Sequence, residues 1–303
     1  MVMVSIGRRR MYNIEQLKMF VYAVELGSFS ASARELGKVQ SAVSQGISNL
    51  EIDFNVQLFD RSTRKPTLTA QGQQIFKQVK AIILQVEDLN SSVNAINNQE
   101  EGLLRIALDD ALLLPSLPKV LDKFSRTFPA TEIELMAAAS TDVNRLVSQD
   151  RADIGLMFTD LAFHADSEPC FIGNLPFVAV CHPSHALAEV SVAKLPDFIS
   201  HRQLILRGNK GKVIDHFPVV AGKVWWANSF VAIKEMIVHS SVGWAYLPSY
   251  LVEHEIQQGK LNQINVSFDH KTWSPPVDLV ISKKAMKGPG LLWLEDNLKT
   301  LLD

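Results

Sequence analysis

The sequence has only two cysteines, Cys170 and Cys181, among its 303 residues. Two thiols cannot build the disulfide framework of a small secreted domain. No run of about 18 apolar residues occurs, which is the length that a membrane-spanning helix needs, so no membrane partner is expected. In the N-terminal stretch MVMVSIGRRRM the basic residues follow the apolar ones, which is the reverse of a signal peptide. We therefore expect a cytoplasmic protein, with residues 1–10 as an unstructured arm and Met11 as an alternative start.

The common catalytic motifs are also missing. Neither G-x-S-x-G, H-E-x-x-H nor C-x-x-C occurs, and no nucleophile–base set is evident. GNKGKV is too short for a phosphate loop, and its Lys lacks the following Ser or Thr. Cys181, His182 and His185 could be metal ligands, but a strand end followed by a turn fits them better. Cys170 and Cys181 could form a redox pair, although two small core residues are the simpler interpretation. We expect no enzyme, metal or cofactor.

Length and charge suggest two parts with different partners. A chain of 303 residues corresponds to about two domains. Residues 1–98 contain 11 Lys and Arg against 8 Asp and Glu, a net charge of +3, whereas residues 99–303 contain 19 against 24, a net charge of −5. A small basic module on an acidic body is typical of proteins that bind nucleic acid at one end.

Three short helices are predicted near the N-terminus. Asn13 can cap the first helix, which Gly27 ends. Ser30 can cap the second, which Gly37 ends. The third helix should bury one apolar stripe, with spacings of four, four and three residues: Val39, Val43, Ile47 and Leu50.

The other faces of this third helix carry short hydrogen-bonding groups in place of the Glu and Lys of an ordinary solvated helix. In a helix-turn-helix, the second helix of the pair enters the major groove, where amide and hydroxyl side chains can bond base edges. The basic turn after residue 60 could supply phosphate contacts. A solvated surface on a small helical bundle is the alternative. The polar residues are Gln40, Ser41, Ser44, Gln45, Ser48 and Asn49.

A long helix should follow, with a narrow apolar seam. Its residues repeat at intervals of four and three, as in a heptad, and a seam this narrow favours a partner helix from a second chain. Packing on the following domain is the alternative. The seam consists of Ile75, Val79, Ile82, Val86, Leu89, Val93 and Ile96.

From residue 103 onward, apolar strands alternate with helical segments. One set covers about 103–158, and a second begins near 174. This alternation predicts parallel sheets that are covered by helices on both faces. Two such sets favour a two-lobed body with a cleft between the lobes.

Residues 14–72 closely resemble the winged helix-turn-helix of LysR-type transcriptional regulators. The resemblance rests on GSFSASARELG, QSAVSQGISNLE, LFDRS and LTAQG, which follow one another almost without gaps. The remainder resembles that family's effector domain more loosely, including HPSHALA and VGWAYLP. The resemblance implies a linker helix that pairs two chains, dimers that often pair into tetramers, and an effector domain similar to a periplasmic solute-binding protein.

Individual roles follow from this resemblance. Base contacts are expected from Gln40, Ser41, Ser44, Gln45 and Asn49, and DNA backbone contacts from Ser28, Ser30, Arg61, Arg64, Lys65 and Thr67. One position departs from the family pattern, because Gly46 replaces a long polar or basic residue. A glycine within a helix costs about 1 kcal/mol relative to alanine, and we expect it to remove one phosphate contact and weaken DNA binding.

An effector site is expected at helix N-termini that face the cleft, since their free N–H groups bind anions. The candidate residues are Asp109, Asp110, Ser140, Thr141, Arg207, Asn228 and Ser229. Two carboxylates would repel an anion unless Arg207 offsets them. The sequence therefore predicts either a zwitterionic ligand or an Asp110 that caps its helix and faces away. Ser140, Thr141 and Ser229 could equally be simple helix caps.

Together these features predict an α+β multidomain protein. A winged helix-turn-helix over 12–69, with its motif at about 29–48, precedes a dimerisation helix over 70–98 and an effector domain over 103–303. Lobe I covers about 103–173 and 275–303, and lobe II about 174–274. We interpret the chain as a transcriptional regulator that binds double-stranded DNA as a homodimer or homotetramer and senses a small-molecule effector. A DNA-binding protein without a ligand, or a solute-binding protein with a fused helical module, is the alternative.

Overall fold

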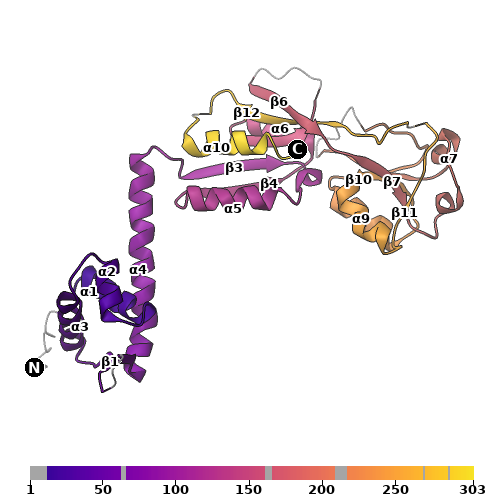
Figure 1. The fold of residues 1–303 in the computed structure, drawn as a ribbon. Helices are drawn as coiled ribbons and strands as arrows, with labels where there is room; N and C mark the ends of the chain where they lie inside the picture. The colour runs from indigo at the N-terminus through magenta and orange to yellow at the C-terminus, as the bar shows by residue number, and fades with distance from the viewer. Residues whose placement is uncertain (1–11, 63–65, 161–165, 209–216, 269, 286) are drawn as a thin grey trace, which may run out of the picture. The chain divides into compact units, whose positions relative to one another are not determined.

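The computed structural model describes residues 12–62, 66–160, 166–208, 217–268, 270–285 and 287–303. The chain forms two compact units, one within residues 1–94 and the other within 95–303, and each is considered by itself (Figure 1). Among the described helices, none has the length and apolar character that crossing a bilayer requires.

The N-terminal unit is a winged helix-turn-helix. It contains α1 (Ile14–Glu25), α2 (Phe29–Glu35) and α3 (Gln40–Phe54). A two-stranded antiparallel wing follows, formed by β1 (Phe59–Asp60) and β2 (Thr67–Leu68). The tip of the wing, residues 63–65, lies outside the described residues.

Capping residues set the limits of the first two helices. Asn13 caps α1 in a capping box with Gln16, as the sequence predicted. The prediction for α2 was wrong by two residues: Ser28 is the N-cap, and its hydroxyl accepts a hydrogen bond from the Ala31 amide, so that Ser30 lies inside the helix. Gly37 adopts a φ of +61° after α2, a left-handed conformation that glycine tolerates best.

The core of this unit explains how α3 is held. Val43, Ile47 and Leu50 have no exposed surface, and burial of each side chain contributes about 1.5–3 kcal/mol. They pack against α1 in one apolar cluster that also includes Phe20. The prediction that Val39 belongs to this stripe was wrong, because Val39 precedes the first helical turn and points into solvent.

The long helix α4 (Ala70–Asn97) has two different halves. Val79 and Ile83 are buried in the winged-helix core, and Ile75 packs against it. The first part of the predicted seam therefore belongs to the domain's own core, because these turns lie over α1. Towards the C-terminal end the seam is open: Leu89 is 62% exposed and Ile96 is 76% exposed.

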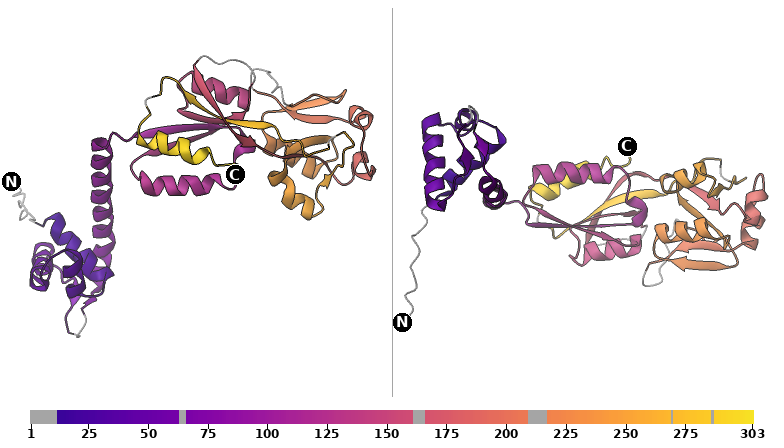
Figure 2. Two further views of the ribbon diagram at one scale, coloured as in Figure 1. Left: turned by 45° about the horizontal axis from the view of Figure 1, so that its top comes forward. Right: turned by 90° about the horizontal axis from the view of Figure 1, so that it is seen from below.

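Lobe I of the second unit is a five-stranded sheet in the order β4-β3-β5-β12-β6. Its strands are β3 (Leu103–Leu108), β4 (Glu132–Ala137), β5 (Ile154–Phe158), β6 (Ser167–Asn174) and β12 (Pro276–Ser282). Its helices are α5 (Leu117–Thr127), α6 (Ser140–Ser148) and α10 (Pro289–Leu298). Alternate residues of β3 face opposite sides: Ile106 packs with the α5 and α10 core, and Ala107 with α6. Figure 2 shows helices on both faces of this sheet.

Lobe II has a second five-stranded sheet, in the order β11-β7-β10-β8-β9. Its strands are β7 (Phe177–Cys181), β8 (Gln203–Leu206), β9 (Val224–Ala227), β10 (Trp244–Pro248) and β11 (Asn262–Gln263). Its helices are α7 (Leu195–Ser200), α8 (Phe230–His239) and α9 (Ser249–Gln257). Short 3₁₀ turns, η1 (Asp110–Leu112) and η2 (Ala186–Glu189), complete the unit.

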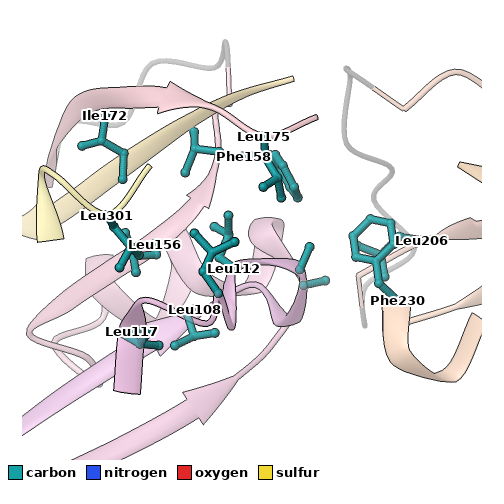
Figure 3. Packing of buried hydrophobic residues seen from close by; sticks show 14 of the residues in the cluster. Leu108, Leu112, Leu117, Leu156, Phe158, Ile172, Leu175, Leu206, Phe230 and Leu301 are labelled. Atoms are coloured by element: carbon teal, nitrogen blue, oxygen red, sulfur yellow. The ribbon is translucent and has the colours of Figure 1, made fainter. Parts of the chain in front are cut away.

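Both sheets are mixed, so the prediction of purely parallel sheets was wrong. Strand β12 runs antiparallel to β5 and to β6, and β7 runs antiparallel to β10 and β11. In lobe I the reason is connectivity: β6 leaves this lobe and β12 returns to it from lobe II, so the two strands run in opposite directions. One buried cluster contains residues of both lobes, and Figure 3 labels Phe158 of lobe I and Phe230 of lobe II among its members.

Candidate functional site

Helix α3 presents a polar face opposite its buried stripe. Gln40, Ser41, Gln45 and Asn49 are exposed, and Ser44 is half-buried. The Gln45 Nε2 atom donates to Asn49 Oδ1 over 2.9 Å, which aligns two amides along the helix. The structure thus brings all five predicted base readers onto one rigid element, with neutral donors and acceptors that suit base edges.

Of the predicted backbone contacts, Ser28, Ser30, Arg61 and Thr67 are among the residues that the structure describes. Thr67 is exposed on β2, and Ser28 and Ser30 are half-buried at the start of α2. Arg64 and Lys65 lie outside the described residues.

Arg61 has a structural role that the sequence did not indicate. Its guanidinium donates to Glu51 Oε2 at 2.9 Å and to the Ser48 hydroxyl at 3.1 Å. Glu51 in turn accepts hydrogen bonds from the Leu58 and Phe59 amides. Arg61 therefore ties the wing to α3 while its side chain remains partly open to solvent.

Gly46 lies on the inner side of α3, so the interpretation of a lost phosphate contact was wrong. It is buried, and a Cβ atom there would come within 2.3 Å of the Met19 Sδ atom of α1. The glycine instead allows the close approach of α1 and α3.

In the C-terminal unit, Asp109 occupies the N-terminus of α6. Its fully buried carboxylate accepts hydrogen bonds from the Ser140 amide at 2.8 Å and the Ser140 hydroxyl at 2.6 Å, and a third from the Ala111 amide at 3.2 Å. Burial raises the pKa of Asp109 to about 7, against these stabilising hydrogen bonds. The N-terminus of α6 is thus occupied by a carboxyl group of the chain itself.

Asp110 does the same for α8, which belongs to the other lobe. Its carboxylate accepts hydrogen bonds from the Phe230 amide at 3.1 Å and the Val231 amide at 3.4 Å. Asp110 therefore caps a helix, but it is buried between the lobes, so the prediction that it faces away was wrong. A second link lies beside it, because the Tyr250 hydroxyl donates to the Ala111 carbonyl over 2.9 Å. Burial raises the pKa of Tyr250, which keeps this phenol a neutral donor.

The other predicted effector residues come from both lobes. Ser229 caps α8 by accepting a hydrogen bond from the Ala232 amide, and Asn228 is exposed. Thr141 is half-buried against Gly208 of lobe II. The Arg207 guanidinium lies 4.9 Å from the centre of the Trp226 ring, so stacking on β9 takes the place of the inward orientation that the sequence suggested.

Sequence reasoning missed an aromatic pocket in lobe II. Its cavity is small, about 10 Å³, and its lining includes Phe217, Phe230, Tyr246 and Trp273. These residues are far apart in the sequence and share no local motif, so no pattern could have grouped them. Phe230 connects the pocket to the interlobe contact, because its own amide is the one that Asp110 binds.

The two cysteines are free thiols, one exposed and one buried. Burial raises the pKa of Cys181 to about 11, which keeps it in the unreactive thiol form at neutral pH. Among the described residues, no group of three or more His, Cys, Asp or Glu side chains could hold a metal ion.

Comparison with known proteins assigns both units. Residues 14–73 match the family described as bacterial regulatory helix-turn-helix protein, lysR family. Residues 97–302 match the family described as LysR substrate binding domain. The chain is 27% identical over 293 residues to the transcriptional regulator AceR of Acinetobacter baumannii, covering 95% of this chain and 96% of AceR. It is 28% identical over 262 residues to the virulence factor regulator MvfR of Pseudomonas aeruginosa, covering 82% and 75% of the two chains.

Solved structures show the same fold. CrgA of Neisseria meningitidis, a LysR-type regulator, superposes with a TM-score of 0.51 at 21% identity over 96% of this chain and 99% of CrgA. CbnR, a LysR-family regulator whose structure was solved with its target DNA, gives 0.51 at 18% identity over 95% and 99% of the two chains. The chain therefore belongs to the LysR family: it is a sequence-specific DNA-binding transcriptional regulator whose C-terminal domain senses a small-molecule effector.

Proposed function

We propose that α3 lies in the major groove and reads bases through Gln40, Ser41, Ser44, Gln45 and Asn49. The exposed amide-and-hydroxyl face over a buried stripe is the observation that carries this proposal. Ser28, Ser30, Arg61, Arg64, Lys65 and Thr67 would contact the DNA backbone. The DNA-bound structure of CbnR, which shares the fold, supports this use of the winged helix. The protein would act in the cytoplasm, where its DNA lies, without a catalytic step or a cofactor.

Substitutions can distinguish the residues that contact bases from those that contact the DNA backbone. Gln45→Ala and Ser44→Ala should each relax the preference at particular base pairs, and a lost bidentate contact of Gln45 should cost about 1–3 kcal/mol. Arg64→Ala should weaken binding to all DNA sequences alike. It should also reduce the slope of the logarithm of the binding constant against the logarithm of salt concentration by about one. Binding to randomised duplexes at several salt concentrations measures both effects, with the exposed Gln71→Ala on α4 as the control. Identical behaviour of the three variants would contradict the assignment.

We propose that two chains pair through the open half of the α4 seam. Ile82, Leu89, Val93 and Ile96 are large apolar side chains exposed on this helix, and burying them against a second copy removes that surface from water. Val86 is half-buried at the centre of the same seam. Ile75 and Val79 are excluded from the interface because they pack inside the N-terminal unit.

The seam proposal predicts a clear change of assembly. Leu89→Glu combined with Val93→Glu should convert the dimer into a monomer, because paired helices would bring four carboxylates together. Sedimentation velocity measures the state, and Gln85→Glu on the exposed surface of the same helix is the control. A double variant that sediments as wild type would rule out this interface.

We propose that a homotetramer forms through the edge strand β9 of lobe II. Trp225 and Trp226 are exposed on this strand, each with an arginine stacked on its ring, Arg202 at 4.5 Å and Arg207 at 4.9 Å. An open edge with two indoles is a surface that a second copy can cover. Replacing both tryptophans with serine should leave dimers but no tetramers in sedimentation velocity, whereas unchanged tetramers would reject the proposal.

We propose that the effector binds at the aromatic pocket of lobe II by displacing its lining side chains, because the cavity of about 10 Å³ has room for about one water, and that it acts through Phe230. The pocket and the Asp110 contact share this residue, so a ligand that moves Phe230 also changes how the lobes are joined. Such a ligand shifts the assembly only if it binds the two states with different affinity. Asp109, Ser140, Thr141, Arg207, Asn228 and Ser229 would then support the lobes around the ligand.

A thermal-shift screen of small metabolites tests the effector proposal. Compounds that stabilise the wild type should lose their effect in Trp273→Ala and should alter the DNA footprint. Trp293→Ala is the control, since Trp293 packs in lobe I, away from the pocket lining. Saturable stabilisation with an unchanged footprint would instead favour a regulator whose DNA binding does not depend on the ligand.

A further inference from the structure

The recognition helix α3 begins in an unusual way. Its N-cap position is occupied by Val39, with φ −85° and ψ 149°, and no side chain accepts a hydrogen bond from the first turn. Ser, Thr, Asp or Asn at this position would stabilise the helix by about 1 kcal/mol relative to a residue that cannot cap. The chain has an aliphatic residue at a place where local stability favours a hydroxyl.

Val39 is not explained by the core either. It is 67% exposed, and its carbonyl, rather than its side chain, starts the helix by accepting hydrogen bonds from Ala42 and Val43. Its isopropyl group therefore contributes neither to the cap nor to the buried stripe. It lies directly before Gln40, at the end of the helix where a recognition helix reaches base edges.

The major groove offers one apolar group among the base edges, the C5-methyl group of thymine. We propose that Val39 is a specificity-determining residue that contacts this methyl group at one T·A pair of each half-site. The inference rests on the proposed position of α3 in the groove, and it extends the readout from hydrogen bonds to an apolar contact. A helix with Ser or Thr at this position would bond a phosphate or its own first turn instead.

A second exposed aliphatic residue on the same helix provides a matched control. Ile52 is also largely exposed, but it lies 13 residues further along α3, roughly 20 Å away at 1.5 Å per residue. The first residues of a recognition helix are those that reach the bases. Ile52→Ser therefore removes a similar apolar surface at the wrong end of the helix.

The test uses the full-length protein and DNA chosen by selection from randomised duplexes. Each thymine of the selected consensus is replaced in turn by deoxyuridine, which lacks only the C5-methyl group. We expect one thymine per half-site at which this change weakens wild-type binding about fourfold, as for one buried methyl group. Val39→Ser should bind the thymine and deoxyuridine duplexes equally, and Ile52→Ser should behave as wild type.

Val39→Ser should also raise the melting temperature, because serine supplies the missing cap. Val39→Ala provides a second variant without a new hydroxyl and should lose the methyl preference as well. The proposal is overturned if no thymine shows the effect, if Val39→Ser and Val39→Ala keep it, or if Ile52→Ser abolishes it too. A selection that yields no consensus overturns the base-reading proposal together with this one, whereas a consensus without methyl dependence overturns the role of Val39 alone.

Discussion

At the scale of single residues, two neighbouring carboxyl groups have different tasks. Asp109 is fully buried and bonds α6 within its own lobe, whereas Asp110 reaches α8 in the other lobe. Both satisfy N–H groups at a helix N-terminus, which otherwise lack partners inside the helix. The chain's own carboxyl groups thus occupy the helix N-termini that would otherwise bind an anionic ligand.

The buried carboxyl group of Asp109 should make stability depend on pH. Its pKa of about 7 lies above the ordinary value of 3.8, so the folded state holds the proton more tightly than the unfolded chain. The free energy of unfolding should therefore fall as pH rises from about 4 to 7, and level off above 7. Urea unfolding at pH 5 and pH 8 should show a difference that Asp109→Asn, which does not titrate, lacks.

Asp109→Asn is expected to lower stability at every pH, because the NH2 group of asparagine replaces one acceptor oxygen beside three hydrogen-bond donors. The informative quantity is therefore the change in the free energy of unfolding between pH 5 and pH 8, and not its absolute value. Wild type and variant profiles that run parallel, or a wild type that becomes more stable towards pH 7, would contradict the raised pKa.

The sequence predicted that these residues lie near helix N-termini, but it did not predict which helix each one caps. Asp110 and Phe230 are 120 residues apart, and a cap supplied across such a distance leaves no local pattern. Helix caps within one segment are more predictable, as Asn13 shows. The error at Ser30 arose because Ser28 and Ser30 both satisfy the local rule for an N-cap, and the structure has Ser28 in that position.

At the scale of elements, α1 and α3 approach closely because residue 46 has no side chain. Two effects oppose each other at this position. Alanine would favour the helix by about 1 kcal/mol over glycine, but its Cβ atom would overlap the Met19 thioether. Overpacking of this kind costs typically about 1–3 kcal/mol, less where a flexible methionine can move.

A double-mutant cycle resolves these two effects. Gly46→Ala should gain about 1 kcal/mol of unfolding free energy in a Met19→Ala background, where the overlap is gone. In the wild-type background the same substitution should gain less or destabilise, so the coupling between the two sites is nonzero. Urea denaturation of the four proteins measures it, and strict additivity would show that residue 46 does not contact α1 as described.

Heptad spacing correctly predicted a helix at α4, but it did not predict which surface covers each part of the apolar seam. The pattern of Ile75 to Ile96 is uniform in sequence, whereas in the structure its first turns are buried within the unit and its last turns are open. Periodicity specifies which face of a helix is apolar and carries no information about which surface covers it. Strand direction in the two sheets was missed for a similar reason, since alternation along the chain does not reveal where the chain crosses between lobes.

At the scale of the whole effector domain, two hydrogen-bonded links join the lobes at one place. The Asp110 carboxylate bonds the first turn of α8, and the Tyr250 hydroxyl bonds the carbonyl of Ala111. Both contacts involve the short 3₁₀ turn that follows β3. A change in this turn is therefore passed to two elements of lobe II, α8 and α9, at once.

Removing the Asp110 carboxylate should loosen this connection in a manner that small anions can reverse. Asp110→Ala leaves the Phe230 and Val231 amides without their acceptor, the first of them buried, which should cost about 1–3 kcal/mol and speed amide hydrogen exchange in Phe230–His239. The freed helix N-terminus is an anion site, so formate should raise the melting temperature of the variant but not that of the wild type. Asp197→Ala is the control, because that carboxylate caps α7 within one lobe, at the Lys194 amide. Formate rescue of both variants alike, or faster exchange in α7 rather than α8, would show that Asp110 acts as an ordinary cap and not as a connection between lobes.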